Sequence, residues 1–295
     1  MTRNFQSHLA MLGFSVLVAG SFSLGSIIAN DISPIALTAV RFILAAIVIG
    51  IIAISTGSVT QAALKSPWRY LVLGGIFSVY FVLMFEGLKT ATPVSTVAIF
   101  TLIPAVSAIA GFVILGQIVS SRIVVALIIG ALGALWVIFR ADIQLLSTFS
   151  IGRGELIFFV GCIAHAIMPI LFRLLNRGEN PLMVTFGLLI SGAIILCIIG
   201  AREIIETDWI GLPTIVWVVI FYVSICASAI TFVLLQFASM HLPATNVMAY
   251  TYLTPIWVLV WELFLGHSVP PLWVLGGVFL AVVSVTLLLK TSLDN

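Results

Sequence analysis

The sequence predicts an all-α integral membrane protein with ten transmembrane helices, arranged as two inverted five-helix repeats with both termini in the cytoplasm. Three observations lead to this prediction: the composition, the spacing of apolar segments and an internal repeat. Of 295 residues, 62% are hydrophobic and 7% are charged, whereas soluble domains contain roughly 25% charged residues. A soluble fold cannot hide that much apolar surface. The continuous apolar runs also exclude a membrane β-barrel, whose strands alternate polar and apolar residues.

The apolar residues form ten segments, each close to the ~20 residues with which an α-helix crosses the ~30 Å hydrocarbon core of a bilayer. The predicted spans are 9–29, 34–54, 70–87, 93–115, 123–139, 155–175, 182–201, 213–238, 243–265 and 272–289. Joints rich in Asn, Asp, Gly and Pro separate them and leave no room for a soluble domain. The first segment is too long for the apolar region of a signal peptide.

The second half of the chain repeats the first after a shift of 151 residues, which places Phe81 on Phe232 and Pro104 on Pro255. Each half has an odd number of spans. The two copies must therefore have opposite orientations, as in many secondary transporters. We predict repeats at 1–145 and 150–295. Chance identity among apolar residues is the alternative, since the first two spans of each half match weakly.

Basic residues indicate the orientation, because cytoplasmic loops retain Lys and Arg. With the N-terminus inside, seven basic residues lie on the inner side and four on the outer side. The inner residues are Arg3, Lys65, Arg69, Arg122, Arg173, Arg177 and Lys290, and the outer residues are Lys89, Arg140, Arg153 and Arg202. This asymmetry favours cytoplasmic termini.

Several function classes fit poorly. The net charge is +2 and the basic residues are scattered, so we expect no nucleic-acid partner. Cys162, Cys197 and Cys226 lie in apolar segments without metal or disulfide spacing, so we expect no metal and no cofactor. No carboxylate lies in the middle of a span, which argues against an enzyme, and a receptor fits the repeat less well. The expected partners are a small-molecule substrate and the lipid bilayer.

Two motifs resemble a known family. In the second span, Pro34 precedes the Arg41-Phe42 pair and Ala45, while the fourth and ninth spans have a central proline and end in Leu-Gly pairs at 115–116 and 265–266. Over essentially the whole chain these features resemble the drug/metabolite transporter superfamily, specifically its EamA-type ten-helix exporters. That family often has a glutamate after the glycine. This chain has Gln117 and His267 there, so any role of that acid is not transferred.

Among ten-helix members, the aromatic residues are similar to those of exporters of aromatic amino acids and paraquat. The resemblance implies a multi-pass protein of the bacterial inner membrane that exports amino acids and related metabolites. It also implies a central cavity between the two repeats. We expect transport by alternating access, in which the halves rock about a central site.

Pro104 and Pro255 lie near the middle of the fourth and ninth spans. Each removes a backbone hydrogen bond and clashes with the carbonyl four residues earlier, at Phe100 or Thr251. Irregular backbone at membrane depth is tolerated where it is buried in protein or lines a cavity. We therefore interpret the pair as hinges at the repeat interface. A simple kink in each helix is the alternative.

One face of the ninth span is polar and aromatic, and at 100° per residue it comprises Asn246, Tyr250, Thr254, Trp257 and Trp261. Lipid tails provide no hydrogen-bond partner for a side-chain amide or hydroxyl. We expect this face, with the neighbouring Thr251, to line a site for a flat or apolar solute. Alternatively, the two tryptophans belong to the interfacial aromatic belt.

Weaker candidates for substrate contact are Tyr80 in the third span and Thr96 and Phe100 in the fourth. Membrane Ser and Thr side chains more often bond their own backbone or a neighbouring helix. His165 is the only ionisable residue near the centre of a span, and such residues usually face a cavity or a partner. It could bind a substrate carboxylate or transfer a proton, which would permit proton coupling. A neutral structural histidine bonded to a carbonyl is the alternative. Met168 continues its face as a pliable apolar wall.

Arg41 and Glu262 lie within a turn or two of the outer ends of their spans. With Trp261 we predict a gate there, in which the two charges could pair; snorkelling to the interface is the alternative.

The leading hypothesis is an exporter of aromatic or other neutral amino acids. A sugar-phosphate or nucleotide-sugar carrier would need cations deep in the cavity to hold phosphate. Arg41 and Arg173 lie near span ends, so that class is a distant alternative. A carrier of organic-cation drugs is another.

Overall fold

The computed structural model describes residues 3–60, 65–139, 142, 144, 147–148, 151–266 and 272–293, with side chains as far as 288. Arg140, His267 and the side chain of Lys290, which entered the sequence analysis, lie outside the described residues. Within the described residues the chain is helical and contains no β-strand.

Each half of the chain supplies five spans. The first half contains α1 (Arg3–Ile28), α2 (Pro34–Ser55), α4 (Trp68–Leu88), α5 (Pro93–Phe100), α6 (Ile103–Leu115) and α7 (Ser121–Ile138). The second half contains α9 (Arg153–Leu175), α10 (Pro181–Ile199), the short α11 (Ala201–Glu206), α12 (Thr214–Ser224), a π-helix (Ile225–Ile230), α13 (Thr231–His241), α14 (Ala244–Ala249), a 3₁₀ turn (Tyr250–Leu253), α15 (Thr254–Phe264) and α16 (Val274–Leu293). Three spans are composite: α5 with α6, α12 through α13, and α14 through α15.

Among the described residues, nine spans have the length and composition to cross a membrane. The tenth, at α16, has a shorter apolar stretch, Leu272–Leu288, which is still within the roughly 17–25 residues of membrane helices. The protein is therefore a multi-pass membrane protein, as predicted. The first helix begins earlier than predicted, at Arg3 instead of residue 9, so that Ser7 and His8 are buried inside the bundle.

Local sequence signals account for the helix ends. Proline occupies the first turn of α2, α5 and α10, where its missing N–H is not needed. The Thr92 hydroxyl accepts the Ser95 N–H at 3.2 Å, and the Asn180 amide oxygen accepts the Leu182 N–H at 2.9 Å, so these side chains cap α5 and α10. Gly116 stops α6 with a φ of 64°, a conformation that favours glycine.

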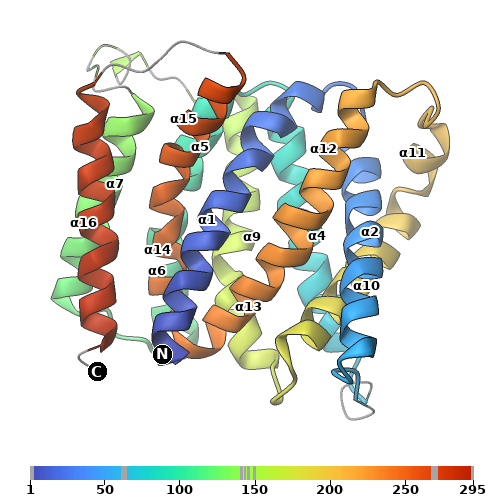
Figure 1. Ribbon diagram of the computed structural model, residues 1–295, viewed down its shortest axis with the longest axis horizontal. Helices are drawn as coiled ribbons and strands as arrows, with labels where there is room; N and C mark the ends of the chain where they lie inside the picture. Colours follow the sequence, from blue (N-terminus) through green and yellow to red (C-terminus); the bar gives the residue numbers. More distant parts are fainter. Residues whose placement is uncertain are drawn as a thin grey trace.

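The two halves have opposite orientations. The start of α1 and the end of α16 lie on the same side of the molecule (Figure 1). The first half begins on this side, which we call the termini side. Five crossings precede α9, so the second half begins on the opposite side. This arrangement confirms the inverted repeat.

The halves are interleaved. α4, the third span of the first half, packs against α9, the first span of the second, and its counterpart α13 packs against α1. The equivalent helices α2 and α10 pack together, and α7 with α16 form a pair at one end of the bundle (Figure 1). Gly74 permits the contact between α4 and α10, because a Cβ there would lie 2.4 Å from the Leu188 carbonyl oxygen. The interior is thus lined by helices of both halves.

Candidate functional site

His165 in α9 lies at the centre of a group of aromatic rings. Its imidazole stacks on the Tyr80 ring with centroids 4.3 Å apart and lies 5.8 Å from the Phe100 ring. Phe14 stacks on it at 6.1 Å, and Phe77 is tilted against it at 5.9 Å. Three helices, α1, α4 and α5, therefore place rings around the imidazole of α9, which is 1% exposed.

These rings belong to a larger buried set that we call the aromatic cluster. Its members are Phe14, Phe22, Phe77, Tyr80, Phe81, Phe100, Phe158, His165, Phe172 and Phe232. Phe81 and Phe232, equivalent by the 151-residue shift, stack with centroids 5.5 Å apart, and Phe77 stacks on Phe232 at 4.3 Å. The interface between the repeats therefore passes through the aromatic cluster.

Neither ring nitrogen of His165 has a hydrogen-bond partner among the described residues. The alternative of a histidine bonded to a carbonyl is thus not what the structure shows. Leaving a buried polar group without a partner costs about 1–3 kcal/mol. An imidazole held between ring faces with both nitrogens available can accept a proton from a solute or donate one to it. Met168, on the same helix, is also fully buried.

The fourth and ninth spans are each broken beside their central proline. α5 ends at Phe100 and α6 begins at Ile103, with Pro104 in its first turn. In the ninth span the 3₁₀ turn at Tyr250–Leu253 separates α14 from α15, and Pro255 lies in the first turn of α15. α6 packs against α14, so the two broken spans meet at the repeat interface. The predicted backbone irregularity is confirmed, and its role as a hinge stays a proposal.

The polar face of the ninth span is directed into the bundle over most of its length. Asn246, Tyr250, Thr251 and Thr254 are buried. The Tyr250 hydroxyl lies 2.8 Å from Nδ1 of His8 in α1. This contact ties the 3₁₀ turn to the first span.

The part of this face that lies farther from the termini side (Figure 1) is only half-buried. The indole N–H of Trp257 donates to the Ser15 hydroxyl at 3.1 Å. Trp261 meets the Tyr222 ring edge-on, with centroids 5.5 Å apart. Both tryptophans thus contact neighbouring helices, and Glu262 beside them is half-buried.

Thr96 follows the structural alternative. Its hydroxyl donates within its own helix to the carbonyls of Thr92 and Pro93, at 3.1 and 2.8 Å. Its hydrogen-bonding capacity is used locally, which weakens it as a substrate contact.

The structure corrects the expectation that Arg41 snorkels to the interface or pairs with Glu262. Arg41 is completely buried. Its guanidinium donates to the Ser228 hydroxyl and to the Ala227 carbonyl in the π-helix. The position looked peripheral because only its distance from the helix end was visible in the sequence. Its direction around α2 carries the side chain inward.

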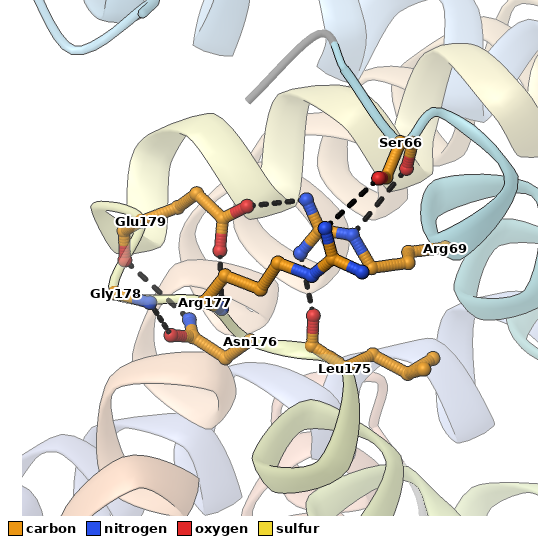
Figure 2. Close-up of polar contacts among 7 residues, drawn as sticks. All are labelled: Ser66, Arg69, Leu175, Asn176, Arg177, Gly178 and Glu179. Atoms are coloured by element: carbon orange, nitrogen blue, oxygen red, sulfur yellow. Dashed lines mark hydrogen bonds and ion pairs between the residues drawn. The ribbon is translucent and has the colours of Figure 1, made fainter. Parts of the chain in front are cut away.

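A polar network joins the halves on the termini side (Figure 2). Arg69 in α4 donates to the Leu175 carbonyl at the end of α9, at 2.6 Å, and to Oε1 of Glu179, at 2.5 Å. Oε2 of Glu179 accepts the Arg177 N–H at 2.6 Å, and the Arg177 guanidinium donates to the Ser66 hydroxyl at 3.0 Å. This network links the loop before α4 to the loop before α10.

Glu179 lies in that loop, outside the membrane spans. Burial raises the pKa of its carboxyl. Hydrogen bonds from Arg69 and from the Arg177 backbone together lower this pKa by more, so that it lies below the ordinary value. An open pocket of about 580 Å³, bordered by Lys65 and Arg177, lies beside the network. The carboxylate therefore stays ionised in this basic surrounding at neutral pH.

Sequence reasoning missed several of these residues. The predicted first span, 9–29, leaves out His8, and in the sequence Phe14 does not differ from the other apolar residues of that span. The sequence carries no signal for the contact of Ser228 with Arg41 or of Arg69 with Glu179, because these partners are 187 and 110 residues apart in the chain. The 151-residue shift makes Phe14 and His165 equivalent positions of the two halves, so the internal repeat does relate these two residues to each other.

Comparisons with known proteins agree with the fold. The model of the EamA-like transporter family matches residues 6–139 and 152–290, once in each half. The "Uncharacterized transporter YyaM" of Bacillus subtilis (strain 168) is 28% identical over 279 residues, covering 94% of this chain and 91% of that protein. A solved crystal structure superposes with a TM-score of 0.74 at 17% identity, over 98% of this chain and 99% of that one. The last likeness concerns the fold alone.

Proposed function

The chain belongs to the EamA-like transporter family, and from this premise we propose that it exports aromatic or other neutral amino acids and related small metabolites. The observation that supports this most directly is the aromatic cluster around His165. Ring faces suit the side chain of an aromatic solute, because offset and edge-to-face ring pairs add about 0.5–1.5 kcal/mol beyond area burial. His165 offers two free nitrogens to the polar end of the same solute.

We propose that the halves, 1–145 and 150–295, rock against each other in alternating access. Support comes from the interleaved packing, since α4 on α9 and α13 on α1 are equivalent contacts between the halves. Pro104 and Pro255 would serve as hinges, because each follows a break in a span at the interface. Trp261 and Glu262 are candidates for a gate on the side opposite the termini.

In this proposal the protein lies in the bacterial inner membrane with both termini in the cytoplasm. His165 would bind the substrate carboxylate or transfer a proton, which would couple export to the proton gradient. Tyr80, Phe100 and Met168 would contact the solute around it, and Asn246, Tyr250 and Thr251 would supply polar groups from the ninth span.

Other cargoes are less well supported. A sugar phosphate needs several cations, and Arg41 is the fully buried cation next to the aromatic cluster. An organic cation needs an acidic partner, and two largely buried carboxylates in the described part of the chain already have partners. Glu155 accepts the Gly152 N–H at 3.0 Å as a helix cap, and Glu179 pairs with Arg69. Family membership supports a carrier over an enzyme.

Counterflow into proteoliposomes tests the proposal. Purified protein is reconstituted in vesicles preloaded with unlabelled solute, and uptake of labelled tryptophan, phenylalanine, leucine, glucose 6-phosphate and tetraphenylphosphonium is compared. We expect tryptophan and phenylalanine to exchange fastest. Uptake no greater than in protein-free vesicles for every amino acid would reject the proposal, and exchange of the phosphate or the cation alone would favour the alternative that it represents.

A further inference from the structure

Arg41 is the largest side chain that the bundle buries completely, and its exposed fraction is 0%. Nε donates to the Ser228 hydroxyl and Nη2 to the Ala227 carbonyl. The guanidinium carbon lies 3.7 Å from the centroid of the Phe81 ring, so the cation faces a member of the aromatic cluster. Nη1 is buried as well and has no hydrogen-bond partner among the described residues.

No carboxylate in the described part of the chain forms an ion pair with Arg41. The ion pairs of the described residues join Arg69 to Glu179, Lys89 to Glu86 and Arg202 to Glu206. A buried charge is costly unless it is paired, and ionisable residues inside membrane bundles mark substrate and ion pathways. The site around Arg41 is therefore complementary to an anionic group.

The partners of Arg41 lie at an irregular point of the eighth span. Residues Ile225–Ile230 form a π-helix in the middle of Thr214–His241, and the Ser228 hydroxyl donates to the Val223 carbonyl at 2.9 Å. π-Helical turns occur mostly as single-turn insertions in α-helices and are frequent at functional sites. The Ala227 carbonyl that Arg41 contacts is thus available to a side chain from another helix.

We propose that Arg41, and not His165, binds the carboxylate of the transported solute while the neighbouring rings hold its apolar or aromatic part. This inference rests on the proposed function and narrows its substrate to an amphipathic monocarboxylate. A carboxylate accepts two parallel hydrogen bonds from the guanidinium fork. Nη1 is free to give one of them, and Nη2 gives the other by leaving the Ala227 carbonyl.

This exchange connects binding to movement. Arg41 belongs to α2 of the first half, and Ala227 belongs to the π-helix of the second. When Nη2 turns to the carboxylate, one of the contacts that hold these halves together is released. The freed Ala227 carbonyl can accept a hydrogen bond from the α-ammonium of an amino acid, so both charged groups of the solute find partners.

Three variants and three probes test the proposal in the full chain. Arg41→Gln removes the charge, and Arg41→Lys keeps the charge but loses the fork. Arg173→Gln is the matched control, because Arg173 is another span arginine that donates to two backbone carbonyls, those of Ser239 and Leu242, at 2.7 Å each. Binding of phenylalanine, phenylpropionate and phenethylamine to detergent-purified protein is measured by calorimetry, with counterflow of the same compounds in proteoliposomes.

We expect Arg41→Gln to weaken binding of both carboxylates by at least about tenfold and to change phenethylamine binding little. The carboxylate affinity of Arg41→Lys should lie between those of the wild type and Arg41→Gln, and the affinity of Arg173→Gln should equal that of the wild type. Equal losses for carboxylates and amine in a folded Arg41→Gln protein, or no loss, would overturn the inference. If Arg41→Gln does not fold, Arg41→Lys provides the test. An Arg41→Lys protein that prefers the carboxylates over phenethylamine as strongly as the wild type does would overturn the inference. Absence of carboxylate binding by the wild type also overturns it.

The proposed function and this inference can fail separately. If the wild type binds phenylpropionate through Arg41 but exchanges no amino acid, the inference about Arg41 stands and the proposal of an amino-acid exporter is rejected. If the wild type exchanges phenylalanine but Arg41→Gln weakens binding of phenylpropionate and phenethylamine equally, the exporter proposal stands and the role of Arg41 in carboxylate binding is rejected.

Discussion

Arg69 and Glu179 form an ion pair that joins the two halves of the protein on the termini side, with Nη2 and Oε1 2.5 Å apart (Figure 2). Both side chains are largely buried, at 2% and 8% exposure. The same guanidinium bonds the Leu175 carbonyl at the end of α9. One arginine therefore binds both the last turn of α9 and the loop that follows it.

We expect Glu179→Ala to loosen this side of the molecule. Arg69 would keep a buried charge without its carboxylate, and breaking a buried pair costs about 3–5 kcal/mol. Hydrogen exchange should rise in peptides covering 65–70 and 175–182, and the midpoint of thermal unfolding should fall. Glu206→Ala is the control, because Glu206 pairs with Arg202 on an exposed surface, where such pairs contribute roughly 0–1 kcal/mol. Equal effects of both variants would contradict the prediction.

The ion pair also predicts a pH dependence. Although burial raises the pKa of Glu179, its hydrogen bonds bring the pKa in the folded protein below the ordinary value. Its stabilisation is therefore fully present above the unfolded pKa, about 4.3, and is lost as the pH falls through the folded pKa. Thermal unfolding of wild type and Glu179→Gln should differ by a constant amount from pH 7 down to about 5, and this difference should shrink below about 4. A difference that grows on acidification would be inconsistent with this sign.

Substitutions at His165 should separate packing from chemistry. His165→Phe keeps a ring between Tyr80 and Phe100 and removes the unpartnered nitrogens, so stability should stay within about 1–2 kcal/mol of wild type. Transport of phenylalanine should nevertheless fall at least tenfold, by about 1.4 kcal/mol or more in transition-state stabilisation, with loss of its pH dependence. His165→Ala should also lose stability, by about 3–5 kcal/mol as for other ring truncations. If His165→Phe transports phenylalanine at the wild-type rate and with the wild-type pH dependence, the role of His165 is structural.

Replacing the interface prolines should slow transport without unfolding the protein. Pro104→Ala and Pro255→Ala each restore a backbone donor and favour a continuous helix. The exchange rate should therefore fall several-fold, while the unfolding midpoint stays equal or rises. Pro93→Ala provides the control, because Pro93 lies in the first turn of its span and therefore does not follow a break within it. Faster exchange in either interface variant, or the same slowing in Pro93→Ala, would argue against hinges.

The sequence by itself determined the number of spans, the inverted repeat and the breaks at Pro104 and Pro255. These features depend on local composition, on spacing or on the chemistry of one residue. A run of about 20 apolar residues has few alternatives to a membrane helix. Proline in a helix interior removes a backbone hydrogen bond and kinks or breaks the helix, although α9 continues through Pro169.

Only the tertiary structure decided which way side chains point around each helix. In a soluble protein, polar residues mark the outer face, but lipid and the bundle interior are both apolar and leave no such contrast. Arg41 therefore looked peripheral in the sequence and is buried against Ser228 in the structure, and Phe14 could not be told from its neighbours although it stacks on His165. Contacts between residues more than 100 positions apart depend on how the two halves interleave, which no local pattern encodes.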